Sequence, residues 1–111
     1  MQIQVIKDKL PELVKEQEKI INYAECKNNE FFLEMLVNQV GTVCNQFFNK
    51  PTVENIIEIQ LVLDAILEAN GVSEEAYKQI RDEMVNQMGT YSNRFIGFFQ
   101  EAAQNGENSA E

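Results

Sequence analysis

The sequence predicts an all-α protein, a small helical bundle in which long antiparallel helices pair across an oligomer interface. Apolar residues recur at steps of three and four through much of the chain, which is the period of one helix face. Hydrophobic residues make up 44% of the 111 residues and charged residues 24%, proportions typical of a globular domain. We assign residues 1–99 to a single helical domain and expect the acidic tail, residues 100–111, to be disordered.

The first helix is expected to follow a short segment that begins extended. Pro11 suits a first helical turn, because its missing N–H would have no partner there. Leu13 and Val14 follow at helical spacing, and Ile20 and Ile21 continue near the same spacing. The pattern predicts a helix that begins at Pro11.

The longest apolar pattern predicts a helix from about Asn28 to Asn49. Asn28 and Asn29 are good N-caps, and Glu30 is an acidic residue in the first turn, where the helix dipole favours negative charge. Cys44 stands on the apolar face, so we expect its thiol to be buried. The apolar positions of this face are Phe32, Leu33, Leu36, Val37, Val40, Val43, Cys44, Phe47 and Phe48.

A second, more apolar helix is expected from Thr52, a good N-cap, to Asn70-Gly71, a good C-terminal stop. Its apolar residues cover nearly the whole circumference, and a 111-residue monomer can hardly bury every side of one helix. We therefore expect a homodimer or a homotetramer.

A further helix is expected to begin at the N-cap Ser73 and to end at Gly89. Its inner stripe is predicted to consist of Tyr77, Ile80, Met84 and Met88. The aromatic-rich residues 90–99 read as extended chain or as a short helix.

The charge distribution argues against nucleic-acid and membrane partners. The chain has nine Lys and Arg against eighteen Asp and Glu, a net charge of −9 that arises entirely from residues 28–111. Such a surface repels phosphate backbones and anionic lipids, whose binding requires basic side chains. Solubility is the plainest reading of this acidic bias.

The absence of histidine excludes His-ligated zinc sites, Ser-His-Asp triads and Cys-His pairs. Cys26 and Cys44 lack the spacing of a redox or metal motif. No signal-peptide pattern and no membrane-spanning apolar run are present, so the expected location is cytoplasmic, with free thiols.

The order of these segments resembles the MazG-like all-α nucleotide pyrophosphohydrolases, in their phosphoribosyl-ATP-pyrophosphohydrolase-like branch. The similarity covers about residues 5–98. It rests on Val5-Ile6-Lys7-Asp8-Lys9-Leu10-Pro11-Glu12-Leu13, on Tyr23, on Glu30-Phe31-Phe32, on Gly71-Val72-Ser73, and on the exit from Gly89 to Arg94. The resemblance implies a dimeric helical scaffold.

The resemblance also implies a Mg²⁺ site made from an E-E-x-x-E segment on the long helix and an E-x-x-D segment on the next. Carboxylates at such spacings share a helix face and suit a hard cation that neutralises substrate phosphates. This chain departs from both motifs. The first aligns with residues 41–45, where Gly41, Thr42 and Asn45 carry no carboxylate, and the second aligns with Asn55 to Glu58.

Two functional hypotheses follow from this departure. In the first, the protein is a catalytically degenerate relative that binds a nucleotide or a protein through its dimeric scaffold, without certain cofactors. In the second, it is an active Mg²⁺-dependent nucleoside triphosphate pyrophosphohydrolase with a rearranged site drawn from Glu30, Glu34, Glu54, Glu58 or Asp64. A third reading is a structural helical protein whose resemblance is accidental.

The residues that the resemblance assigns to a site are few. Glu54 and Glu58 are the remnant metal ligands, at positions i and i+4. Lys9 and Arg94 match basic positions of the family and are the candidate substrate-binding residues. Gly41 costs about 1 kcal/mol relative to Ala inside a helix, which favours either a close approach at this point or drift after a catalytic Glu became dispensable.

Overall fold

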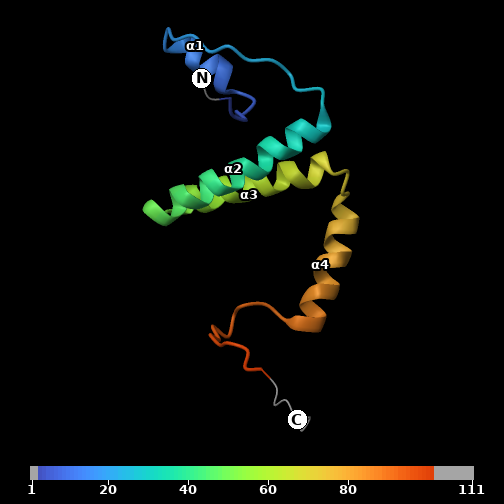
Figure 1. The fold of residues 1–111 in the computed structure, drawn as a ribbon. Helices are drawn as coiled ribbons and strands as arrows, with labels where there is room; N and C mark the ends of the chain where they lie inside the picture. Colours follow the sequence, from blue (N-terminus) through green and yellow to red (C-terminus); the bar gives the residue numbers. More distant parts are fainter. Residues whose placement is uncertain (1–2, 102–111) are drawn as a thin grey trace. The chain divides into compact units, whose positions relative to one another are not determined.

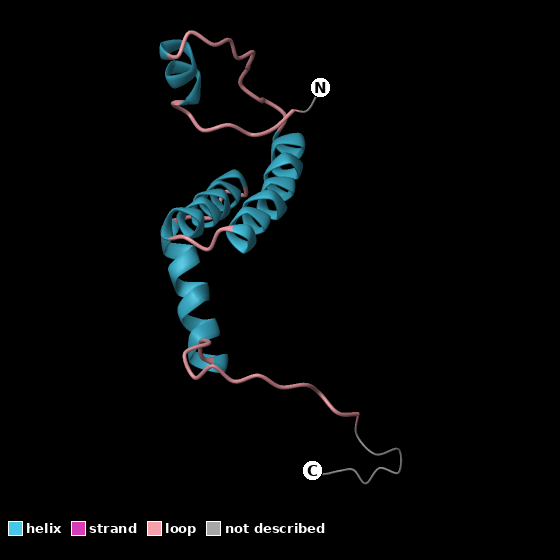
Figure 2. Ribbon diagram, turned by 90° about the vertical axis from the view of Figure 1, so that its left-hand side faces the viewer, coloured by secondary structure: helices cyan, strands magenta, loops and turns pink. Residues whose placement is uncertain are grey.

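The computed structural model describes residues 3–101, which form helices joined by turns and irregular chain, with no strand among them (Figures 1 and 2). This confirms the all-α class. Contacts divide the chain into two units, one up to Tyr77 and one from Lys78 onward. The predicted tail lies, from residue 102, outside the described residues.

The centre of the first unit is a hairpin of two long helices, α2 (Asn29–Asn49) and α3 (Val53–Ala69). The side chain of Asn28 accepts a hydrogen bond from the backbone N–H of Phe31 and caps α2, and Thr52 caps α3 in the same way through the N–H of Asn55. Both helices thus begin and end where the sequence predicts. The short connection between them makes the helices antiparallel neighbours, and they pack together (Figure 1).

Asparagine side chains close both ends of the hairpin. At the turn, Asn55 Nδ2 donates to the carbonyl oxygen of Lys50 at 2.8 Å and lies 3.5 Å from that of Gln46, at the end of α2. At the open end, Asn29 Nδ2 donates to the carbonyl oxygen of Ala69 at 3.0 Å, at the end of α3. The Ala69 carbonyl belongs to the last turn of α3, where backbone partners are lacking. The carbonyls of Gln46 and Lys50 also accept backbone N–H groups, those of Lys50 and Thr52, so the Asn55 amide adds to these bonds.

The buried core of the described residues is small. Only Leu36 and Val43 of α2 are fully buried, with 1% and 2% of their surface exposed. The prediction that the Cys44 thiol is buried is wrong, because Cys44 is exposed. One residue beyond Val43, its side chain is rotated about 100° around the helix and leaves the direction of the α3 contact.

The first helix is shorter than the apolar spacing suggests. Helix α1 (Leu10–Glu16) has Pro11 in its first turn, as predicted, and ends at Gln17. Glu18 then adopts a positive φ of 60°, which is incompatible with a continuing right-handed helix. Ile20 therefore lies in irregular chain and is 90% exposed.

Helix α4 (Glu74–Met88) crosses the boundary between the units, and the hydroxyl of Ser73 accepts a hydrogen bond from the N–H of Ala76 at its start. Gly89 ends it with a φ of 83°, as predicted. In the part of α4 that belongs to the second unit, the Lys78 ammonium donates a hydrogen bond to the Asp82 carboxylate. This bond holds the pKa of Asp82 below its ordinary value of 3.8. Residues 90–101 contain no helix, so of the two interpretations of residues 90–99 the short helix is wrong.

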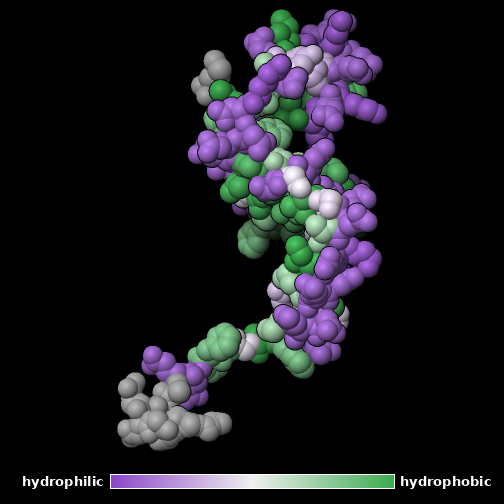
Figure 3. All heavy atoms as spheres, turned by 90° about the vertical axis from the view of Figure 1, so that its right-hand side faces the viewer, coloured by the Kyte–Doolittle hydropathy of each residue, from purple (hydrophilic) through white to green (hydrophobic). Residues whose placement is uncertain are grey.

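Apolar side chains reach the surface of the described chain at many points, as the green atoms between purple ones in Figure 3 illustrate. Among residues 3–101, no helix is both long enough and apolar enough to cross a membrane.

Candidate functional site

Glu58, the one acidic residue left in the second motif, is engaged in an ion pair. Its carboxylate lies 2.5 Å from the ammonium nitrogen of Lys7, which is 51 residues away in sequence. The Glu58 side chain is 32% exposed and that of Lys7 is 62% exposed. The pair ties the N-terminal segment to the middle of α3.

This ion pair borders a pocket between residues 5–8 and the α2/α3 hairpin, which we call the N-terminal pocket. Its volume is about 520 Å³. The apolar walls include Val5, Ile6, Phe32, Leu61, Val62 and Ala65, from all three segments. The polar residues of the lining are Lys7, Asp8, Asn29, Gln39, Glu58 and Glu68.

The other residues predicted for a site are exposed. Glu54 occupies the first turn of α3, where a carboxylate also favours the helix dipole. Lys9 is the N-cap residue of α1 in the first unit, and its side chain makes no capping hydrogen bond. Arg94 belongs to the second unit and has a positive φ of 61° in a turn closed by its N–H and the carbonyl of Tyr91.

The positions that align with the first acidic motif lie on exposed parts of α2. Gly41, Thr42 and Asn45 are all exposed. A Cβ built on Gly41 would meet nothing within 4 Å, so no described residue approaches this glycine closely. Two interpretations of Gly41 were open, a close approach and drift. The described residues contain no close approach to Gly41 within one chain.

Asn55, which aligns with the first acid of the second motif, has a structural role that a carboxylate could not fill. It donates hydrogen bonds to carbonyl oxygens at the end of α2, and a carboxylate has only acceptors. The residues at the two motifs thus offer a divalent cation one carboxylate, that of Glu58, which already faces an ammonium. This set does not fit a Mg²⁺ site, which calls for several oxygen ligands.

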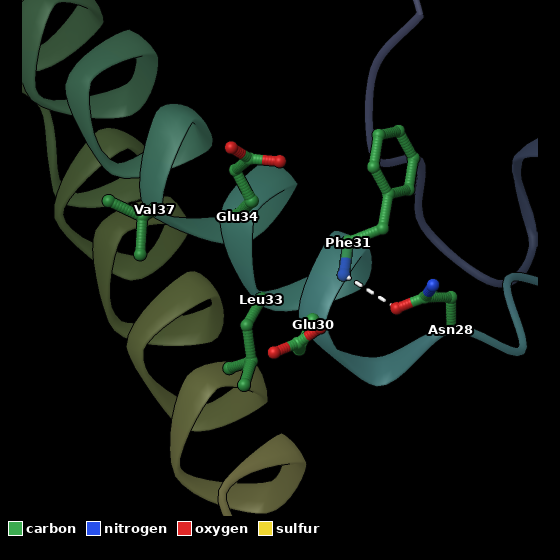
Figure 4. A pocket seen from close by; sticks show the side chains of 6 residues that line it. All are labelled: Asn28, Glu30, Phe31, Leu33, Glu34 and Val37. Carbon is green, nitrogen blue, oxygen red and sulfur yellow. Dashed lines mark hydrogen bonds between the residues drawn. The ribbon is translucent and has the colours of Figure 1, made fainter.

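The remaining acidic candidates lie in other hollows. Glu30 and Glu34 line an open depression of about 600 Å³ along the first turns of α2, together with Phe31, Leu33 and Val37 (Figure 4). Asp64 lines another, of about 660 Å³, near the end of α3. Within residues 3–101, no three acidic or cysteine side chains converge as metal ligands.

The sequence places Lys7 only within the N-terminal motif and Asn29 only at an N-cap, whereas in the structure both make contacts between distant segments. Lys7 is two residues from the predicted Lys9, in a segment without helical period. Its partner is 51 residues away, so no local spacing links the two. The remaining signal is compositional: a segment of zero net charge, residues 1–27, precedes a strongly acidic remainder.

Comparisons with protein-family models, with curated proteins and with solved structures give no match to this chain.

Proposed function

We propose that this protein is a self-associating helical scaffold that acts by binding, as a catalytically degenerate relative of the MazG-like nucleotide pyrophosphohydrolases. The observation that carries the proposal is the set of contacts made by the side chains at the acidic-motif positions. Glu58 pairs with Lys7, and Asn55 caps the end of α2. Both side chains make contacts between segments of this chain, and Gly41 has no side chain at all.

Self-association is supported by apolar side chains that one chain leaves uncovered. On α3, Ile56 is 44% exposed and Leu63 is 45% exposed, although they belong to a helix packed in the hairpin. Burial of apolar surface is worth about 25 cal/mol per Å², so covering this helix further is strongly favourable. Lone exposed apolar residues are ordinary, but a group on one helix indicates an interface.

The spacing of these residues favours a second copy of the chain as the cover. Two series of apolar residues follow the alternating three- and four-residue steps of a helix–helix seam. We call them the seam: Leu33, Val37, Val40, Cys44 and Phe47 on α2, with Ile56, Ile59, Leu63 and Ile66 on α3. None of the α3 members lines the N-terminal pocket, which uses Leu61, Ala65 and Glu68 on the opposite flank of that helix. Two hairpins joined along the seam would form a four-helix bundle.

The ligand proposed for this scaffold is a nucleotide or another protein, and the resemblance offers Lys9 of the first unit and, separately, Arg94 of the second unit as contacts for a nucleotide. The test is titration calorimetry of the full chain with Mg²⁺ or Mn²⁺ and a panel of nucleoside triphosphates, with pyrophosphate release assayed on the same samples. Binding without release supports a nucleotide-binding scaffold. Absence of both heat and release leaves a protein ligand. Metal-dependent release contradicts the proposal and supports the active enzyme with a relocated carboxylate site.

A combined variant tests the relation to the family. Gly41→Glu, Thr42→Glu and Asn45→Glu, together with Glu58→Asp, should give the chain Mn²⁺ affinity if the aligned positions share a face. Glu58→Asp alone is the control, because it restores no ligand on α2. Equal metal affinity of the two variants would contradict the alignment.

A further inference from the structure

We propose that the N-terminal pocket binds a small organic cation, an ammonium group carried on an aromatic or aliphatic body. The inference rests on the proposed binding function and assigns this pocket a ligand of its own, distinct from a nucleotide bound elsewhere on the scaffold. It starts from the volume of about 520 Å³, because pockets of about 300–1,000 Å³ are the usual size for small molecules. Most of the lining comes from apolar side chains of three separate segments.

The walls of the pocket select an apolar ligand body. Val5 and Ile6 form one side, Phe32 belongs to α2, and Leu61 and Ala65 belong to α3. Leu61 is 48% exposed, so a ligand that covers it removes apolar surface from water. A flat or branched hydrocarbon group gains most from walls of this kind.

The charges at the pocket select a cationic group. The lining carries three carboxylates, those of Asp8, Glu58 and Glu68, and one ammonium, that of Lys7. Lys7 pairs with Glu58 and neutralises it. Within residues 3–101, Asp8 and Glu68 form no ion pair, and they leave the pocket with an excess of negative charge.

The same charges disfavour phosphate groups in this pocket. A triphosphate would meet two unneutralised carboxylates, and the ammonium that the described residues contribute to the lining, that of Lys7, is already paired. An ammonium would meet those carboxylates as a counter-ion, and because Asp8 and Glu68 are exposed this attraction should weaken in high salt. The pocket therefore discriminates by charge between ligands with the same hydrocarbon body.

The experiment compares naphthylethylamine, naphthylethanol and naphthylacetate, which share one aromatic body and differ in charge. Binding to the full chain is measured by titration calorimetry, and the site is located from amide chemical-shift changes. We expect the amine to bind more tightly than the alcohol, the acetate to bind most weakly, and the shifts to centre on Val5, Ile6 and Ala65.

Three variants separate this pocket from general attraction to an acidic protein. Ala65→Phe fills the pocket and should abolish binding of the amine. Glu68→Gln removes one carboxylate and should weaken binding by about two- to fivefold, the range of a partly exposed ion pair. Glu83→Gln removes an exposed carboxylate of α4 and should leave the affinity unchanged.

Three outcomes would overturn the inference: no binding of the amine, equal affinity for the acetate, or equal effects of Glu68→Gln and Glu83→Gln. Glu68→Gln keeps the test valid if Ala65→Phe fails to fold. Pyrophosphate release from a nucleoside triphosphate would instead refute the proposed function, whatever the amine does. Failure of the amine without such release refutes the ligand class alone.

Discussion

The α2/α3 hairpin and the unit from Lys78 onward have similar local signals and very different packing. Helix α4 is capped by Ser73 and stopped by Gly89, just as α3 is capped by Thr52 and stopped by Asn70 and Gly71. The hairpin nevertheless buries Leu36 and Val43 and ties its ends with side-chain amides. In the second unit, Ile80 is 54% exposed and the apolar residues from Tyr91 to Phe99 are at least 89% exposed.

This difference shows that capping residues and the spacing of apolar residues determine where a helix begins and ends. Contacts between segments determine how stable that helix is. Most helical stability in proteins comes from packing of an apolar face, and only the hairpin has such packing among the described residues. We therefore expect substitutions in the hairpin to matter more than equivalent ones in α4.

The largest effect is expected from Leu36→Ala, at the best buried position. Removing a buried leucine side chain leaves a cavity and should lower the free energy of unfolding by about 2–5 kcal/mol. The control is Ile80→Ala on α4, an exposed site at which changes stay within about 0.5 kcal/mol. Urea unfolding followed by circular dichroism measures both. Equal losses would show that α4 is packed as well as the hairpin.

The next effect is expected from Asn55→Ala, which removes the amide that caps the end of α2. The free energy of unfolding should fall by about 1 kcal/mol, the net value of one hydrogen bond. Asn38→Ala, at an exposed position inside α2, is the matched control and should be neutral or slightly stabilising, because alanine favours helices. If the two variants unfold alike, the amide contacts at the turn contribute nothing to stability.

A gain is expected from Gly41→Ala. The added methyl group meets open space and lowers the chain entropy of the unfolded state, so stability should rise by about 0.5–1 kcal/mol. Gly71→Ala is the control with the opposite sign, because its φ of 71° strains any residue with a Cβ. Thermal unfolding compares the two. A loss of stability at Gly41 would indicate that another chain lies against it.

The smallest effect concerns Asp82 on α4. Because the hydrogen bond from Lys78 lowers the pKa of Asp82 in the folded state, its stabilising contribution is present above pH 3.8. That contribution is lost as the pH falls below 3.8 through the folded-state pKa. The stability difference between the natural chain and Asp82→Asn should therefore shrink on acidification, and also in high salt. A difference that is independent of pH would contradict the pairing.

Much of the helical framework could be predicted, because its signals are local. Asn28, Thr52, Ser73 and Gly89 mark boundaries through their own hydrogen bonds or backbone angles. The early end of α1 could not be predicted from apolar spacing, because Ile20 fits the period but nothing packs against it. The prediction that Cys44 is buried is wrong for the same reason. A helical period does not reveal how much of one helix face the neighbouring helix covers.

The candidate site was less accessible to sequence reasoning. Glu58 could be singled out by alignment, but its ion pair with Lys7 joins segments 51 residues apart. Asn55 was read as the loss of an acid, whereas the structure gives its amide a capping role. The N-terminal pocket depends on where residues 5–8 lie against the hairpin, which no spacing encodes.

Sedimentation velocity over a range of protein concentrations tests the central claim, self-association through the seam, most directly. Leu61 and Leu63 are a matched pair on α3, 48% and 45% exposed, on opposite flanks of the helix. We expect the natural chain and Leu61→Glu to sediment as a dimer or tetramer, and Leu63→Glu to sediment as a monomer. A natural chain that stays monomeric at every concentration, or a Leu63→Glu variant that still associates, would contradict the account.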